Sequence, residues 1–324
     1  MNDRRLLNVA TPWGALACIL LAVALLQTPE GQPVSAYFLT WDNARFLAAQ
    51  GIVTGLGALG MGLILLSGGM DLSAGAAAAL AGLVTALLFQ GGASALVALG
   101  AGVLTGGALG LLNGSLAAVL RAPPWAITLG TLAVIRGAAC WLAATAIPLP
   151  EGAGGLAAWV APLPSWMPLA PGVWVVLLWG VLLGGLWRGS VLGRHAAAIG
   201  SSEKAARLCG VHVYRVKTCV YTLAGICFGL AGVAQAAATG RAAPAGGAGL
   251  AVEWIAAAVI GGVRLGGGAG SVFGALLGAV VITVLRNACQ QAGWAVPLQE
   301  MVLGGALLVA VGLDRLRHGA RDQG

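Results

Sequence analysis

Residues 55–88 read "GLGALGMGLILLSGGMDLSAGAAAALAGLVTALL", and this stretch decides the fold class. It contains one charged side chain, Asp71, and the pair Gly68-Gly69 divides it into two apolar runs. When helical, an apolar run of about 20 residues matches the hydrocarbon core of a bilayer. A break in such a helix at membrane depth is tolerated only where protein or a water-filled cavity surrounds the backbone. The stretch therefore predicts two membrane helices joined by a Gly-rich break.

The composition of the whole chain extends this prediction. Of 324 residues, 59% are hydrophobic and only 8% are charged, whereas about a quarter of a soluble domain is charged. The long apolar runs do not alternate as the strands of a β-barrel would. We therefore expect an all-α, polytopic membrane bundle. The net charge of +7 does not indicate nucleic-acid binding, because the basic residues lie at segment ends and in loops.

Apolar runs predict ten membrane spans within one transmembrane domain, residues 1–324. Two Gly-rich breaks separate the second span from the third and the eighth from the ninth. The predicted spans cover approximately residues 9–27, 46–66, 73–90, 94–120, 125–147, 172–187, 218–238, 253–264, 270–288 and 298–314.

The start of the chain allows two interpretations. Arg4 and Arg5 precede an apolar core, as in a secretory signal peptide. No A-x-A cleavage site follows before Pro29, and Cys18 comes too early in the run for lipoprotein cleavage. We therefore expect an uncleaved first span.

The distribution of basic residues predicts the orientation. With ten spans, four basic regions fall on one side of the membrane, and the positive-inside rule makes that side cytoplasmic. Both termini are then cytoplasmic, and the opposite loops carry tryptophans and prolines suited to an outer interface. The basic regions contain Arg4 and Arg5, Arg121, the segment 193–217, and Arg315, Arg317 and Arg321.

Glycine is abundant, with 53 residues. Small residues let membrane helices approach closely, so "GLGALGMG" (55–62), "GAGVLTGGALG" (100–110) and "GSVFGALLGAV" (270–280) indicate packed faces or sliding surfaces. A faint repeat relates the Gly-Gly pair at Gly68 to the pair at Gly261. Interrupted, repeated helices are common in transporters, with breaks near the substrate route.

Polar residues within spans are candidates for a translocation pathway, because a charge at the bilayer centre costs about 3 kcal/mol on insertion scales. For Arg136 the alternative is an ion pair with Asp71 or Glu253. For Asp71 the alternative is capping of the third span. The predicted pathway residues are Gly68, Gly69, Asp71, Asn113, Arg136, Gly261 and Gly262.

The sequence predicts no catalytic apparatus, metal site or cofactor. Lys204 and Lys217 lack the glycine pattern of a phosphate-binding loop. The histidines have no triad partners, and the six scattered cysteines form neither a disulfide framework nor, with His195 and His212, a metal site. Energy for uphill transport would therefore come from another protein.

One long charged segment, "GRHAAAIGSSEKAARLCGVHVYRVK" (193–217), interrupts the apolar chain. Within it, "SSEKAARLCG" predicts a short helix with Ser201 or Ser202 as N-cap and Gly210 as its end. Glu203 and Arg207 suit the two ends of the helix dipole. Ala205, Ala206 and Leu208 would form a small apolar side that inserts into a groove on a soluble partner. A solvated connector is the alternative.

This segment resembles the cytoplasmic ATPase-coupling loop of ABC-importer permeases of the ribose/xylose/simple-sugar type. The family pattern is close to G-R-x-x-x-A-I-G-x-x-E-x-A-A-R-x-x-G, and the chain supplies Gly193, Arg194, Ala198, Ile199, Gly200, Glu203, Ala205, Ala206, Arg207 and Gly210. Similar stretches occur in family order, including "LLNGSLAAVLRAPPWAITLGTLAVIRG" (111–137), "AVIGGVRLGGGAGSVFGALLGA" (258–279) and "VLGGALLVAVGLDRLR" (302–317).

The resemblance implies a permease subunit in the bacterial inner membrane, itself without enzyme activity. A second permease copy or paralogue, a cytoplasmic ABC ATPase and a periplasmic substrate-binding protein would be its partners. The cargo would be a monosaccharide or related small polar solute, or alternatively a branched-chain amino acid or nucleoside. A secondary transporter working without an ATPase is a further alternative. Ala197, Ser201, Ser202, Arg264 and Gly266 depart from the usual family residues.

Overall fold

The structure is a computed structural model that describes residue 14 and residues 38–120, 122–150, 154–160 and 168–318. The predicted first span, 9–27, lies outside the described residues except for Gly14. Each predicted span from the second onward contains a helix. These helices are α3 (Trp41–Leu66), α4 (Ala74–Gln90), α5 (Ala95–Val119), α6 (Pro124–Leu142), α8 (Pro171–Gly189), α11 (Val213–Thr239), α12 (Leu250–Ile260), α13 (Val272–Gln291) and α14 (Val296–His318).

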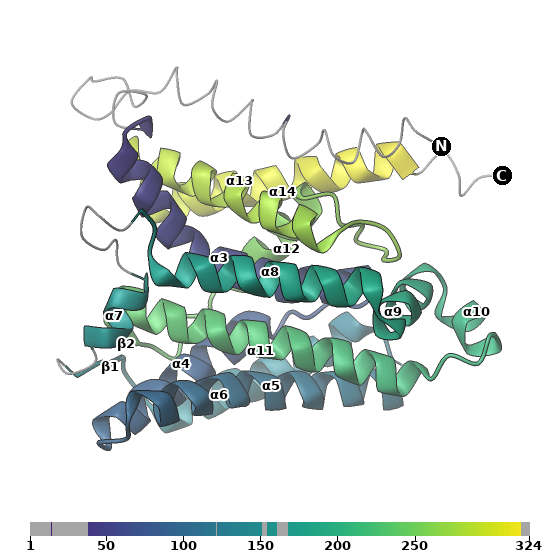
Figure 1. Ribbon diagram of the computed structural model, residues 1–324, viewed down its shortest axis with the longest axis horizontal. Helices are drawn as coiled ribbons and strands as arrows, with labels where there is room; N and C mark the ends of the chain where they lie inside the picture. Colours follow the sequence, from purple (N-terminus) through teal and green to yellow (C-terminus); the bar gives the residue numbers. More distant parts are fainter. Residues whose placement is uncertain (1–13, 15–37, 121, 151–153, 161–167, 319–324) are drawn as a thin grey trace.

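Short elements occupy the two ends of the bundle (Figure 1). Helix α7 (Gly154–Val160) and a two-stranded antiparallel sheet lie at one end. In that sheet β1 (Ile147–Pro148) pairs with β2 (Arg241–Ala242), and Ile147 is opposite Ala242. Helices α9 (Val191–Ser201) and α10 (Glu203–Leu208) lie at the other end, beyond the end of α8.

The helices confirm the prediction of an all-α membrane protein. Among the described residues, α3, α5, α6, α8, α11 and α13 are long and apolar enough to cross a bilayer. Shorter apolar helices are α4, α12 and residues 296–312 of α14. With 11 residues, α12 extends about 16 Å, roughly half of a hydrocarbon core of about 30 Å. It ends where the second Gly-rich break begins.

Helices α3, α4 and α11 form the buried centre, and α11 packs on α3, α4 and α5. Glycine makes the contact between α5 and α11 possible, because a Cβ on Gly106 would overlap the carbonyl oxygen of Gly225 and one on Gly110 would overlap that of Tyr221. In the same way Gly57 leaves room for the ring of Trp254. The stretch 100–110 is therefore part of a tightly packed helix face. This agrees with the interpretation of its glycines as a packed face.

Candidate functional site

The charged segment forms two helices held by local caps. Ser190 caps α9 through a 3.1 Å hydrogen bond from the Gly193 amide, and Ser202 caps α10 through a 3.3 Å bond from the Ala205 amide. Gly210, with φ +81°, follows the end of α10. The predicted short helix and its cap are therefore present. Sequence reasoning missed α9, although the serine at position 190 was a signal for its start.

The two helices expose different side chains. Ala206 is buried, with 4% exposure, whereas Leu208 is 83% exposed. The apolar side predicted for α10 is thus divided, since Ala206 contacts the protein and Ala205 and Leu208 face outward. In α9, Gly193 lies against the backbone of Trp187, and Arg194 faces outward.

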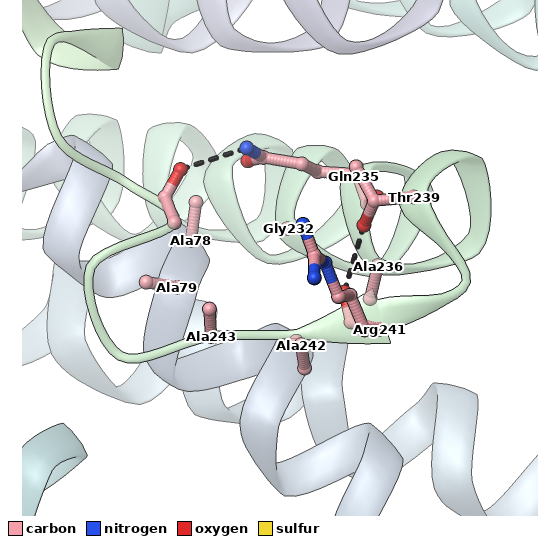
Figure 2. A pocket seen from close by; sticks show the side chains of 11 residues that line it. Ala78, Ala79, Gly232, Gln235, Ala236, Thr239, Arg241, Ala242 and Ala243 are labelled. Atoms are coloured by element: carbon pink, nitrogen blue, oxygen red, sulfur yellow. Dashed lines mark hydrogen bonds between the residues drawn. The ribbon is translucent and has the colours of Figure 1, made fainter. Parts of the chain in front are cut away.

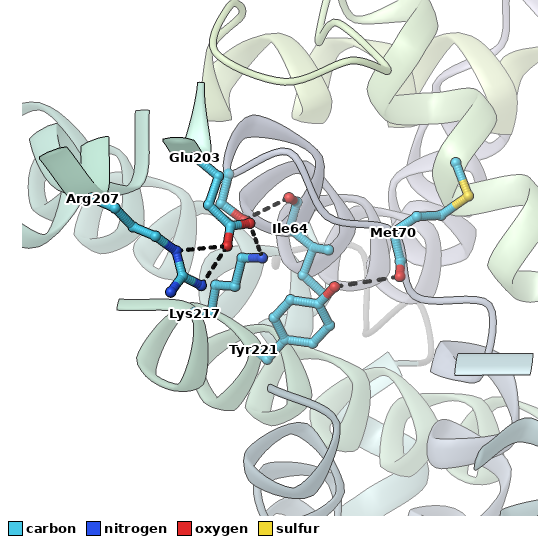
Figure 3. A network of polar contacts seen from close by, with 7 residues as sticks. Ile64, Met70, Glu203, Arg207, Lys217 and Tyr221 are labelled. Atoms are coloured by element: carbon cyan, nitrogen blue, oxygen red, sulfur yellow. Dashed lines mark hydrogen bonds and ion pairs between the residues drawn. The ribbon is translucent and has the colours of Figure 1, made fainter. Parts of the chain in front are cut away.

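An ion-pair network fixes α10 to the start of α11 (Figure 3). The Glu203 carboxylate accepts from Arg207 Nη2 at 2.7 Å and from Lys217 Nζ at 2.6 Å. Partial burial acts to raise the pKa of Glu203, but the hydrogen bonds and charges of Lys217 and Arg207 outweigh it and hold this pKa below its ordinary value. Because Lys217 is only 7% exposed, Glu203 is the counter-ion of a buried cation.

The end of α9 meets both Gly-rich breaks, and we call this contact the glycine crossing, formed by Gly68, Gly200, Gly267 and Gly268. A Cβ on Gly200 would overlap the carbonyl oxygen of Leu66 and lie 2.6 Å from the amide nitrogen of Gly268. A Cβ on Gly267 would lie 2.6 Å from the Gly68 Cα. The Gly268 amide donates to the Leu66 carbonyl at 3.0 Å. Three segments far apart in the sequence therefore touch through their backbones.

The helix that precedes each break ends with the same hydrogen-bond pattern. At the end of α3, the Gly69 amide bonds to the Ile64 carbonyl at 3.0 Å and the Gly68 amide to the Leu65 carbonyl at 2.9 Å. At the end of α12, Val263 and Gly262 make the equivalent bonds to Ala258 and Val259 at 3.0 and 2.9 Å. Both are Schellman motifs, with φ +76° at Gly68 and +86° at Gly262. The geometry thus aligns Gly68 with Gly262, one position from the alignment that the sequence suggested.

The pathway candidates Asp71 and Asn113 lie together in the interior. Asp71 is 2% exposed. One carboxylate oxygen accepts from the Ser73 amide at 2.8 Å and from the Ser73 hydroxyl at 2.6 Å. The other accepts from Asn113 Nδ2 at 3.2 Å. Asp71 thus orders the first turn of α4 and ties it to α5.

The third polar candidate, Arg136, does not join this cluster. It faces outward from the middle of α6, and among the described residues it pairs with neither Asp71 nor Glu253. The predicted alternative of such an ion pair is therefore wrong. The buried Glu253 instead pairs with Arg286 at 2.9 Å and accepts from the Thr54 hydroxyl at 2.6 Å. Arg286 was not identified from the sequence as the partner of Glu253, because nothing in their spacing along the chain connects the two residues.

A cleft of about 490 Å³ lies between α10 and the first break. Its charged lining consists of the residues of the ion-pair network together with Lys204. The rest of the lining is formed by Gly68, Ala117, Ala122 and Pro124. Within the described ranges, no group of three or more His, Cys, Asp or Glu side chains is placed to hold a metal ion. The polar α9–α10 segment is thus joined to both Gly-rich breaks through the backbone contacts of Gly200.

Comparisons with known proteins identify the family. Residues 43–311 match the family described as the permease component of the branched-chain amino acid transport system. The chain is 34% identical over 274 residues to the probable ABC transporter permease protein YphD of Escherichia coli strain K12, covering 85% of this chain and 82% of that protein. It is 31% identical over 314 residues to the ribose import permease protein RbsC of the same strain, covering 94% of each.

A shorter match, 39% identical over 129 residues, relates the chain to the xylose transport system permease protein XylH of Haemophilus influenzae, covering 40% of this chain and 34% of that protein. No solved structure matches the chain. The family match and the two long alignments each span most of the chain, and the ordered motifs agree with them. The chain therefore belongs to the family of branched-chain amino acid transport system permease components.

Proposed function

We propose that the chain is the membrane-spanning permease subunit of an ATP-driven importer of a monosaccharide or related small polar solute. The names of two relatives, a ribose import permease and a xylose transport system permease, favour this cargo over branched-chain amino acids and nucleosides. ATP hydrolysis belongs to a separate cytoplasmic ABC ATPase. A periplasmic substrate-binding protein and a second permease copy or paralogue complete the assembly in the bacterial inner membrane.

The glycine crossing is the observation that carries this proposal. The exposed α9–α10 pair is the docking site for the ATPase, and Gly193, Arg194, Gly200, Glu203, Ala205, Ala206, Arg207 and Gly210 hold its form or present its surface. Gly200 contacts the backbone at Leu66 and Gly268, at the two breaks. A movement of the docking helices therefore displaces α3–α4 and α12–α13 together, which would switch the access of the pathway.

The docking surface is tested with a single exposed side chain. Leu208→Asp places a charge where an apolar side chain would enter a groove, and we expect pull-down of the cognate ATPase to fall at least tenfold. Leu39→Asp is the matched control, because Leu39 is 79% exposed and precedes α3 by two residues. The start of α3 lies at the end of the bundle opposite α9 and α10 (Figure 1). This variant should bind the ATPase as the wild type does.

Two results would contradict the proposal. One is undiminished ATPase binding by Leu208→Asp. The other is accumulation of solute by the purified chain in vesicles that contain no ATPase, which would identify a secondary transporter.

A further inference from the structure

A second polar cleft lies at the end of the bundle opposite α9 and α10, between α4, the end of α11 and β2 (Figures 1 and 2). Its volume is about 180 Å³. Most of its wall is made of side chains no larger than a methyl group. These residues are Ala78, Ala79, Gly82, Gly232, Ala236, Ala242, Ala243 and Gly246.

Three polar side chains complete the wall: Gln235, Thr239 and Arg241 (Figure 2). Gln235 Nε2 donates to the Gly246 carbonyl at 2.7 Å, which orients the amide and leaves its Oε1 as an acceptor. The Thr239 hydroxyl lies 2.7 Å from the Arg241 carbonyl and 2.9 Å from that of Gln235. Its proton is used there, so its lone pairs remain available. The exposed Arg241 guanidinium supplies donors.

This set of groups suits a ligand with many hydroxyls. Each hydroxyl both donates and accepts, and the wall offers an amide oxygen, a hydroxyl oxygen and a guanidinium beside small apolar surface. Specific pockets combine apolar walls with a few placed polar groups in this way. Among the described residues that line the cleft, none is acidic, aromatic or a large aliphatic. An amino-acid ammonium would therefore lack a carboxylate partner, and a nucleobase would lack a stacking surface.

The cleft is also joined to the first Gly-rich break. Its wall on α4 begins one turn after the start of that helix, directly beyond the break. At the floor of the cleft α4 and α11 touch through their backbones, because a Cβ on Gly232 would overlap the Ala78 carbonyl and one on Gly82 would lie 2.9 Å from the Gly232 carbonyl. A shift of α4 therefore changes the shape of the cleft.

From these observations we propose that the cleft is a substrate subsite at the outer end of the pathway and that it accepts a small neutral polyol of monosaccharide size. This inference rests on the proposed function and adds to it the site at which such a solute binds. Arg241 reaches the ligand from the rim, while Gln235 and Thr239 select hydroxyls from within.

The experiment fills the cleft without touching the docking helices. Ala243→Trp places an indole in the cleft, and Ala245→Trp is the matched control, because Ala245 is exposed in the same loop and does not line the cleft. Each variant is reconstituted with its cognate ATPase and binding protein. ATP-driven uptake is measured for radiolabelled D-ribose, D-xylose, a panel of hexoses, L-leucine and inosine. Thr239→Val, which removes only the hydroxyl, is the second variant.

We expect the wild type and Ala245→Trp to transport a sugar, Ala243→Trp to lose at least nine-tenths of that uptake, and Thr239→Val to raise the KM several-fold. All variants should retain ATPase pull-down. Equal sugar uptake by Ala243→Trp and Ala245→Trp overturns the subsite and leaves the proposed function standing. Transport of leucine or inosine in place of sugar, or an ATPase-bound wild type that moves no sugar of the panel, overturns the cargo of the proposed function. Failure of the wild type to bind the ATPase overturns its ATP-driven mechanism.

Discussion

Asp71 is held in the protein interior by donors that belong to the protein itself. Its two oxygens accept from the Ser73 amide, the Ser73 hydroxyl and Asn113 at 2.6–3.2 Å. A buried charge is retained only where such partners replace water. The hydrogen bonds to Ser73 agree with the capping alternative for this residue, and its role in the pathway stays a prediction.

Asp71→Ala tests this residue. Removal of the carboxylate leaves the buried Ser73 amide and the Ser73 hydroxyl without their acceptor, at a cost of about 1–3 kcal/mol for each buried group. Asn113 keeps its 2.7 Å hydrogen bond to the Ser73 hydroxyl. We expect normal membrane insertion and ATPase pull-down, uptake reduced at least fivefold, and a Tm lower than that of Asp71→Asn. Uptake in vesicles and thermal unfolding of the purified proteins provide the measurements. Wild-type uptake by Asp71→Ala would assign the residue a purely structural role.

Glu203 determines how the stability contributed by its ion pairs depends on pH. Its folded-state pKa is lowered, so the stability that its ion pairs contribute is present above the pKa of the unfolded chain, about 4.3. It is lost as the pH falls through the lower folded-state value. The pairs that hold α10 to Lys217 are therefore intact throughout the physiological range.

At the scale of elements, the glycine crossing makes the end of α9 dependent on backbone contact. In Gly200→Ala the new methyl group would overlap the Leu66 carbonyl, so the segments must separate. We expect ATPase pull-down to persist while ATP-driven uptake falls at least tenfold. Gly189→Ala is the control, because nothing lies within 4 Å of a Cβ built on Gly189. Loss of ATPase binding by Gly200→Ala would mean that the residue only supports the fold of the segment.

Elements whose limits are set locally could be predicted from the sequence. The Ser202 cap and the end of α10 just before Gly210 depend on residues within a few positions of one another. The glycine crossing could not be predicted, because Gly200 and Gly268 are joined only by tertiary packing. The outward direction of Arg136 could not be predicted either. Lipid and protein interior are both apolar, so the periodicity of a membrane helix such as α6 does not show which face is buried.

At the scale of the whole molecule, the separation of its two polar ends predicts its orientation. The docking helices lie at one end, and β1, β2 and the start of α3 lie at the other (Figure 1). Cys209 is exposed beside Leu208, so it can be labelled in a variant whose other cysteines are replaced by serine. In intact spheroplasts a membrane-impermeant maleimide should leave Cys209 unlabelled and should label Leu39→Cys in a cysteine-free chain.

Inside-out vesicles should give the opposite pattern, with Cys209 labelled and Leu39→Cys protected. Labelling of Cys209 from the outer face would contradict both the orientation and the docking of a cytoplasmic ATPase. The positions and order of the helices from the second predicted span onward could be predicted from apolar runs, because run length is a property of the bilayer. The number of membrane spans stays a prediction. The arrangement of those spans around α4 and α11 depends on which glycines meet, as Gly106 and Gly225 do.

The backbone contact at Gly200 has a mechanical consequence. Where two side chains touch, a change of rotamer absorbs part of any displacement, and the joint is soft. Where Gly68, Gly200 and Gly267 meet, no side chain intervenes, and the peptide planes have few ways to yield. The joint is accordingly stiff, so a push of a fraction of an ångström on one side should reappear almost undiminished on the other. The displacement is then passed on at a contact where a bulkier residue would absorb part of it.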